Sequence, residues 1–250
     1  MTIPADQRDW RRAVWPARPR LNHAGAKPRR GLDRWLVVMV KAATAGRVKT
    51  RLARGIGAGR AASFYRTGLA IEVRRLSAPG RWRLVLAVTP DGEISSAALP
   101  PGTDRCGQGA GDLGARMQSV FDSLPPGPVV IVGSDCPGLT AAHVAAAFRA
   151  LGRADVVMAP SPDGGYGLIG LARRRRVPHL FRGVRWSHEK TRADTLANAA
   201  GLAVILLAEL ADVDEADDLV RADLKGLIGR LVIGAAARVT EGKSMLAKAR

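Results

Sequence analysis

Residues 125–137 read PPGPVVIVGSDCP, and this stretch holds the pattern that decides the fold. Its prolines and glycine break the preceding helix, and the apolar residues Val129–Val132 follow at strand length. Ser134 and Asp135 come just after this apolar run. A run that is apolar on both faces is typical of a parallel sheet covered by helices on both sides. The stretch therefore predicts a buried strand with an acidic side chain at its carboxyl end.

The alternation of strand and helix extends from this stretch in both directions. Strands are predicted at Trp35–Val40, Trp82–Val88, Asp155–Ala159, Tyr166–Leu171 and Ala203–Leu207. Helices are predicted at about 58–76 and from the glycine-rich stretch 106–114 to Leu124. Two more are predicted to begin at a capping residue, one from Thr140 to about Leu151 and one from Ser187 to near Gly201. A last helix is predicted to begin in the acidic segment Asp212–Asp218. The sequence has no internal repeats. We therefore expect one α/β domain with a mostly parallel sheet covered on both faces.

The composition is that of an ordinary globular protein. Hydrophobic residues make up 47% and charged residues 24% of the 250 residues, which excludes disorder as the main state. The most apolar stretch, Leu202–Ala208, is far shorter than a membrane span, and no secretory signal is apparent. Two cysteines are too few for a disulfide scaffold and fit a reducing compartment. We expect a cytoplasmic protein.

The net charge of +17 is concentrated at the two ends of the chain. Residues 1–34 hold nine basic and three acidic side chains, and residues 221–250 hold seven and two. Together the two ends supply +6 and +5, or eleven of the seventeen charges. We expect residues 1–34 to form a flexible basic arm, residues 35–222 to form the domain, and residues 223–250 to form a basic extension. Nucleic acid is therefore not the partner that we expect.

The carboxyl ends of the predicted parallel strands carry the residues suited to chemistry. Such ends meet at one edge of a sheet, where α/β proteins bind their ligands. After the first strand comes KAATAGRVKTRL, residues 41–52. In this loop Gly46 would let backbone amides approach an anion, while Lys41, Lys49 and Arg51 would add charge-assisted bonds to phosphate. Val48 precedes Lys49, so the loop is not a Walker A motif. A solvated basic loop is the alternative.

Residues 109–114, GAGDLG, match the dinucleotide-binding pattern G-x-G-x-x-G, and Asp135 follows 21 residues after Gly114. That fingerprint requires a strand directly before it, whereas LPPGTD, residues 99–104, precedes the match. We interpret these glycines instead as a loop that folds over a bound nucleotide. Arg116 would then contact phosphate or base.

Acidic residues follow several of the predicted strands. Asp135 suits Mg²⁺ or Mn²⁺, which take carboxylate and phosphate oxygens, although an Asp that bonds its own turn is an equal alternative. Asp163 lies in PDGG, residues 162–165, which is ordinary turn chemistry. Asp212 and Asp214 are spaced to share a cation or to favour a helix N-terminus. Together these acids favour metal-assisted phosphate chemistry. The four histidines form no recognisable Ser-His-Asp or Cys-His arrangement.

Six ordered motifs carry a resemblance to a known family. They are K41…GRVKTRL (46–52), QGxGxLGxRM (108–117), GSDCP (133–137), DGGY (163–166), WS (186–187) and DVD (212–214). The chain resembles the bacterial glycosyltransferase-A-like "transferase 1" family associated with radical-SAM and selenium-linked gene clusters. That family is similar to the 2-phospho-lactate guanylyltransferases and, more distantly, to the molybdenum-cofactor guanylyltransferases.

The resemblance implies a nucleotide-diphospho-sugar transferase fold, Rossmann-like and three-layered, with an antiparallel element in its sheet. It also implies roles for individual residues. Lys41, Gly46, Lys49, Arg51, Gln108, Gly109, Gly111, Gly114 and Arg116 would bind the nucleotide, Asp135, Asp212 and Asp214 would hold the metal, and Asp163, Gly164, Gly165 and Tyr166 would line the acceptor side. This sequence departs from the family pattern at Ala43, Gly167, His188 and Glu215.

These observations predict a Mg²⁺-dependent transferase that uses an activated nucleotide and a small-molecule acceptor. Lys49, Arg51 and Asp135 would be its catalytic residues. The basic loop slightly favours nucleotidyl transfer from a nucleoside triphosphate over glycosyl transfer from a nucleotide sugar. A non-catalytic protein that binds nucleotides or nucleic acid is the alternative from another class. The base, the acceptor and the oligomeric state stay open.

Overall fold

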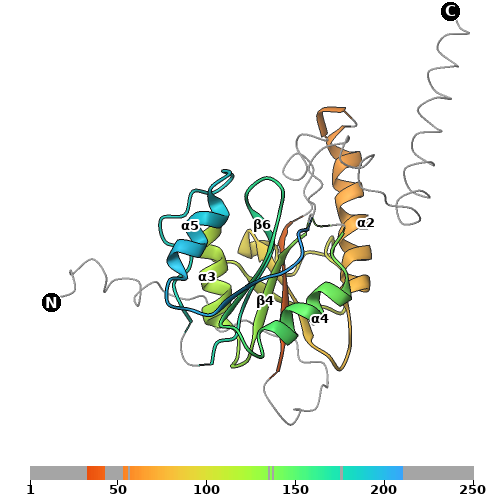
Figure 1. Ribbon diagram of the computed structural model, residues 1–250. Helices are drawn as coiled ribbons and strands as arrows, with labels where there is room; N and C mark the ends of the chain where they lie inside the picture. The colour runs from red at the N-terminus through yellow and green to blue at the C-terminus, as the bar shows by residue number, and fades with distance from the viewer. Residues whose placement is uncertain are drawn as a thin grey trace, which may run out of the picture. The chain divides into compact units, whose positions relative to one another are not determined.

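The computed structural model describes residues 33–42, 53–55, 57–134, 136, 138–174 and 177–210. Within these ranges one sheet runs through the molecule in the strand order β3-β2-β1-β4-β6-β5-β7 (Figure 1). The strands are β1 (Trp35–Lys41), β2 (Arg83–Thr89), β3 (Asp104–Gly107), β4 (Val129–Gly133), β5 (Val156–Pro160), β6 (Tyr166–Leu171) and β7 (Val204–Leu206). The helices are α2 (Ala58–Leu76), α3 (Leu113–Ser123), α4 (Ala141–Ala150) and α5 (Thr191–Asn198), with a short 3₁₀ turn η2 (Asp91–Glu93).

The sheet is mostly parallel, as predicted. β1 pairs in parallel with β2 and β4, β2 with β3, and β5 with β7. β6 runs antiparallel to both of its neighbours, β4 and β5. It is the antiparallel element that the family resemblance implies. The carboxyl ends of the six parallel strands and the turn between β5 and β6 therefore lie at one edge of the sheet, which we call the rim.

Two apolar layers cover the sheet, and this explains why its strands are apolar on both faces. Leu36 and Val38 of β1 pack in the layer that contains α2 and α4, and Trp35 and Val37 pack in the layer that contains α3. Figure 1 shows α2 and α4 on one side of the sheet and α3 and α5 on the other. Each fully buried Leu or Val contributes roughly 1.5–3 kcal/mol to folding. Both faces of the central strands thus hold the fold together.

Most predicted elements are present with boundaries shifted by one or two residues, but one strand was missed and one helix begins later than predicted. The missed strand is β3, whose sequence DRCG is short and partly charged. The helix expected to begin at a Ser187 cap begins at Thr191 instead, and Ser187 adopts a left-handed φ of 54° in the preceding loop. The helix expected after Asp212 and the basic arm up to residue 32 lie outside the described residues. In the part of the chain that the structure describes, no helix is long and apolar enough to span a membrane.

Candidate functional site

The ends of β1 and β4 are joined at the rim by a side chain of α2. The hydroxyl oxygen of Tyr65 accepts a hydrogen bond from the backbone nitrogen of Lys41 at 3.2 Å and lies 3.1 Å from Oγ of Ser134. Tyr65 is buried. Lys41 opens the predicted phosphate loop, and Ser134 precedes Asp135 in the sequence. Tyr65 therefore fixes the two points from which the predicted phosphate-binding and metal-binding segments continue.

No role in the site was predicted for Tyr65 from the sequence. The available signal was its phenol group, because a buried tyrosine hydroxyl usually finds a hydrogen-bond partner. Several predicted site residues lie outside the described residues, so their placement stays a prediction: Gly46, Lys49, Arg51, Asp135, Asp212 and Asp214.

The glycine loop, residues 108–112, connects the carboxyl end of β3 to the start of α3. Gly109 and Gly111 have φ values of 77° and 101°, a conformation that residues with side chains rarely adopt. Asp112 caps α3, since its carboxylate accepts a hydrogen bond from the nitrogen of Ala115 at 2.8 Å. A strand does precede these glycines, so the ground given above for setting the dinucleotide fingerprint aside was wrong.

Gln108 is buried, and its side chain is engaged by the protein itself. Its amide nitrogen donates to the carbonyl oxygens of Val40 at 3.1 Å and Ala87 at 2.8 Å. Its amide oxygen accepts from the guanidinium of Arg116 at 3.3 Å. Gln108 thus connects β1 and β2 to Arg116. The side-chain amide of Gln108 is therefore engaged within the protein, and its expected role in binding a nucleotide stays a prediction.

Gly114, the last glycine of the pattern, lets α3 approach residues 177–190, which we call the loop before α5. A Cβ at this position would come within 2.7 Å of the Trp186 ring and 2.8 Å of Cβ of Phe181. These two aromatic rings contact one another at a centroid distance of 6.1 Å. A glycine is therefore required at position 114 by close packing.

The turn between β5 and β6 holds the predicted acceptor-side residues. Asp163 accepts hydrogen bonds from Oγ of Ser161 at 2.6 Å and from the nitrogen of Gly165 at 2.9 Å. The turn chemistry that the sequence left open for Asp163 is thus present. Gly164 has a φ of 84°, and any side chain there would overlap the backbone of Glu189. The turn consequently packs directly against the loop before α5.

Tyr166 and Gly167 begin β6 at the rim. The Tyr166 hydroxyl lies 3.3 Å from Oγ1 of Thr195 in α5, and burial raises the pKa of this phenol, so it stays protonated at neutral pH. A Cβ on Gly167 would lie 2.9 Å from Sγ of Cys136. The departure from the family pattern at Gly167 therefore has a steric reason, because a large side chain there would displace Cys136.

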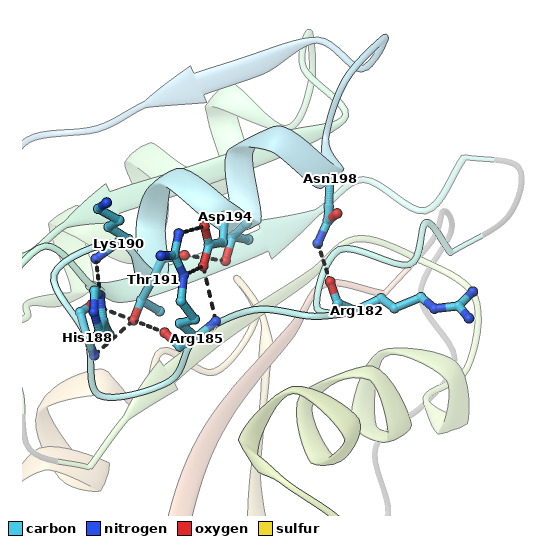
Figure 2. Close-up of polar contacts among 8 residues, drawn as sticks. Arg182, Arg185, His188, Lys190, Thr191, Asp194 and Asn198 are labelled. Carbon is cyan, nitrogen blue, oxygen red and sulfur yellow. Dashed lines mark hydrogen bonds and ion pairs between the residues drawn. The ribbon is translucent and has the colours of Figure 1, made fainter.

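The loop before α5 is held by an ion pair (Figure 2). The guanidinium of Arg185 makes two hydrogen bonds to the Asp194 carboxylate, at 2.6 and 2.8 Å, and the Arg185 backbone nitrogen adds a third at 3.1 Å. These bonds from Arg185 lower the pKa of Asp194 to about 2. Thr191 Oγ1 lies 2.6 Å from the Arg185 carbonyl oxygen and 2.7 Å from that of His188. The loop is therefore preorganised beside the β5–β6 turn.

His188, another departure from the family pattern, takes part in this loop. Its ring nitrogen Nδ1 accepts a hydrogen bond from the backbone nitrogen of Lys190 at 3.1 Å (Figure 2). The side chains of Arg182, His188 and Lys190 are exposed to solvent. The carbonyl oxygen of Gly164 accepts a hydrogen bond from the backbone nitrogen of Arg192 at 3.0 Å. The loop before α5 and the β5–β6 turn therefore form one surface.

The described residues contain no group of three or more His, Cys, Asp or Glu side chains that could hold a metal ion. At the rim the Asp163 carboxylate is engaged within its own turn, and Asp91 is bonded to backbone amides. The acids that the sequence analysis assigned to a divalent cation, Asp135, Asp212 and Asp214, lie outside the described residues. Their assignment stays a prediction.

The chain is similar in sequence to known proteins. Residues 72–188 match the family model described as "uncharacterized protein conserved in bacteria" (DUF2064). The chain is 32% identical over 205 residues to 2-phospho-L-lactate guanylyltransferase of Methanopyrus kandleri, which covers 80% of this chain and 96% of that protein.

Two solved structures that are similar to this chain carry the names of enzymes. One, assigned as a nucleotide-diphospho-sugar transferase from Desulfovibrio desulfuricans, has a TM-score of 0.69 and 30% identity over 79% of this chain and 90% of that chain. The 4-diphosphocytidyl-2C-methyl-D-erythritol synthase of Anaerococcus prevotii has a TM-score of 0.50 and 9% identity over 77% of this chain and 97% of that chain, which shows likeness of fold alone. The nucleotide-diphospho-sugar transferase fold expected from the sequence is confirmed.

Proposed function

This chain belongs to the family of 2-phospho-L-lactate guanylyltransferase, a family of nucleotide-using transferases, and we propose that it transfers a nucleotidyl group from a nucleoside triphosphate to a small anionic acceptor. The observation that carries the proposal is the 32% sequence identity over 205 residues, which span 96% of the guanylyltransferase. The name of that relative makes GTP the first donor to test.

The rim provides the support for binding a triphosphate. Tyr65 joins Lys41 to Ser134, so the basic loop that begins at Lys41 and the acid that follows Ser134 start from fixed points. In the proposed reaction an acceptor oxygen attacks the α-phosphorus. The bond from that phosphorus to the α–β bridging oxygen breaks, and pyrophosphate leaves. Lys49 and Arg51 would offset the charge that develops on the pyrophosphate.

A divalent cation, Mg²⁺ or Mn²⁺, completes the proposal. Asp135, Asp212 and Asp214 would hold it, because carboxylates with phosphate oxygens are the ligands that such ions prefer. When bound, the ion would polarise phosphate oxygens and neutralise part of their charge.

The surface of the β5–β6 turn and the loop before α5 would receive the acceptor. His188 and Lys190 are exposed beside this turn, and the Arg185–Asp194 pair holds their loop. An acceptor with a phosphate or carboxylate group would be attracted by Lys190. Tyr166 lies at the edge of this surface, where its ring would limit the size of the acceptor. Its hydroxyl is uncharged at neutral pH.

Glycosyl transfer from a nucleotide sugar is the second candidate. The structure from D. desulfuricans, which is assigned as a nucleotide-diphospho-sugar transferase, favours it. Both candidates share the nucleotide and the cation and differ in which bond of the donor breaks.

The experiment is a thermal-shift panel of the four nucleoside triphosphates and of nucleotide sugars, each with and without Mg²⁺ or Mn²⁺. A triphosphate at about one hundred times its Kd stabilises by about 2.7 kcal/mol, which raises the Tm by roughly 5–10 °C for a chain of this size. We expect the largest metal-dependent shift with a triphosphate. A larger shift with a nucleotide sugar would support glycosyl transfer, and no shift with any nucleotide would overturn both candidates.

A further inference from the structure

The side of the sheet that carries α2 and α4 exposes charged side chains of a single kind. The two helices pack together, and Figure 1 shows them on the same side of the sheet. Six exposed arginines lie on these helices or beside them: Arg34, Arg66, Arg74, Arg81, Arg149 and Arg153. We call these six residues the arginine face.

Acidic side chains do not neutralise the arginine face. The acid of α2, Glu72, is buried, and the sequence of α4 contains no acid. Asp33 and Asp155, which precede β1 and β5, are paired with Arg83 and Arg174 instead. Within the ranges that the structure describes, no arginine of the face forms an ion pair. The positive charge of this surface is therefore uncompensated.

The opposite side of the sheet differs in its charge. There α3, α5 and the loop before α5 expose the acids Asp112, Asp122 and Glu189 together with the bases Arg182 and Lys190. Because charges of both signs alternate on that side, the arginine face is not simply a consequence of the basic composition.

Two guanidinium groups of the face are supported by buried rings. Cζ of Arg34 lies 5.9 Å from the ring centroid of Phe148, and Cζ of Arg81 lies 5.2 Å from that of Trp82. The two rings are themselves 5.8 Å apart. A guanidinium that lies over a ring keeps N–H groups available, and its planar fork matches the oxygens of a phosphate. These two arginines are thus preorganised for an anionic partner.

The surroundings of the arginines indicate which polyanion fits. The exposed large hydrophobic residues of the described ranges are Leu113 and Leu206, and neither belongs to α2 or α4. Protein interfaces have an apolar or aromatic centre, and membrane-bound helices insert apolar side chains, so the face suits neither partner. Single strands stack their bases on exposed rings, but Phe148 and Trp82 are buried. The phosphate backbone of a duplex needs only cations.

We propose that the arginine face binds the phosphate backbone of double-stranded nucleic acid without reading its sequence. From the sequence, nucleic acid was not expected, because eleven of the seventeen net charges lie in the two ends of the chain. The gathering of arginines on one side of the folded domain is an observation that the sequence alone does not provide. None of the six belongs to the rim motifs, so duplex binding is a further activity, independent of the proposed transfer reaction.

The test measures binding of a mixed-sequence DNA duplex of about 25 base pairs, by fluorescence anisotropy over a series of salt concentrations. All proteins are full-length, so the basic ends are present in each. The face variant carries three substitutions on the arginine face: Arg74→Gln, Arg149→Gln and Arg153→Gln. The control variant removes the same charge from the other side of the sheet: Arg182→Gln, Lys190→Gln and Arg192→Gln.

We expect the affinity of the unmodified protein to fall steeply with salt. Each phosphate contact contributes about −0.9 to the slope of log K against log salt, so the face variant should lose about 2–3 units of slope. It should also bind at least about tenfold more weakly at low salt, whereas the control variant should stay within about twofold of the unmodified protein.

The face variant also serves to separate this proposal from the proposed function. Arg74 and Arg149 lie in the last turns of their helices, at the ends remote from the rim. The face variant should therefore unfold cooperatively and keep the thermal shift with GTP and Mg²⁺. Failure of the unmodified protein to bind GTP would overturn the proposed function and leave the result with the duplex standing.

Three outcomes would overturn duplex binding by the arginine face. The first is the absence of duplex binding by the unmodified protein. The second is an equal loss of affinity in the face and control variants, which would assign the binding to net charge or to the ends of the chain. The third is tighter binding of poly-L-glutamate, or of phosphatidylglycerol vesicles, than of the duplex.

Discussion

The hydroxyl oxygen of Tyr65 lies 3.1 Å from Oγ of Ser134, so a helix on one face of the sheet is bonded to the carboxyl end of the central strand β4. The same hydroxyl accepts from the backbone of Lys41 at the end of β1. The gap between these two strand ends is where an open α/β sheet offers space for a ligand. Tyr65 thereby joins Lys41 to Ser134, the described residues that precede the segments we assign to phosphate and metal.

Replacement of Tyr65 by Phe tests this role. The ring and its packing remain, and the loss of the hydroxyl should cost about 1 kcal/mol of unfolding free energy in denaturant titration. We also expect a smaller Mg²⁺-dependent thermal shift with GTP. Ser63→Ala, at an exposed position of the same helix, is the control and should change neither quantity. A Tyr65→Phe protein with unaltered nucleotide stabilisation would remove Tyr65 from the site.

Gly114→Ala tests the close contact of α3 with Trp186 and Phe181. The added methyl group would come within 3 Å of both side chains, and overpacking of this kind costs about 1–3 kcal/mol. The matched control is Gly68→Ala in α2, where the space around the new Cβ is open. There the better helix propensity of Ala should stabilise by up to about 1 kcal/mol. Chemical denaturation of both variants checks the contrast, and equal effects would contradict it.

Asp194→Asn tests the ion pair that holds the loop before α5. Arg185 lowers the pKa of Asp194 from 3.8 to about 2, so the pair stabilises the folded state above pH 3.8 and is lost as the pH falls toward 2. The variant should therefore be less stable than the unmodified protein at neutral pH, and the difference should shrink through this acidic window. Glu189→Gln, which removes an exposed charge from the same loop, is the control. A stability difference that is the same at neutral and acidic pH would contradict this account.

Cys106 should be inert toward thiol reagents in the folded protein. It is buried in the apolar layer with α3, and burial, reinforced by the charge of Asp91, raises its pKa to about 12. In a Cys136→Ala variant, where Cys106 is the only thiol, we expect reaction at about pH 8 to require unfolding by guanidinium. Rapid reaction of the folded protein would show that this layer is open.

The strands were predictable because each buried strand is a nearly continuous apolar run. β3 was not, because its charged residue Arg105 is satisfied by the loop just before the strand: its guanidinium donates to the carbonyl oxygens of Ile94, Ser96, Leu99 and Pro100. The direction of β6 does not follow from its apolar pattern. Its short link to β5 did carry that information, since only antiparallel strands are joined by so tight a turn.

The glycine loop was predictable because its residues lie within one short motif, whereas contacts between residues far apart in the sequence were not. The glycines were found from their spacing, but no contact with their loop was predicted for Asp91, because its amide partners come 17 and 18 residues later. Tyr65 was missed for the same reason, as its partners lie 24 and 69 residues away. The assignments of Gly46, Lys49, Arg51, Asp135, Asp212 and Asp214 stay predictions.

The central claim is a nucleotide site that joins the basic loop to a cation held by Asp135. Calorimetric titration of GTP in the presence and absence of Mg²⁺, with the unmodified protein, Asp135→Ala and the control Glu93→Gln, tests it most directly. We expect Mg²⁺-dependent binding by the unmodified protein and by Glu93→Gln, and loss of that dependence in a folded Asp135→Ala protein. Unchanged Mg²⁺-dependent binding by Asp135→Ala, or no GTP binding by the unmodified protein, would contradict the account.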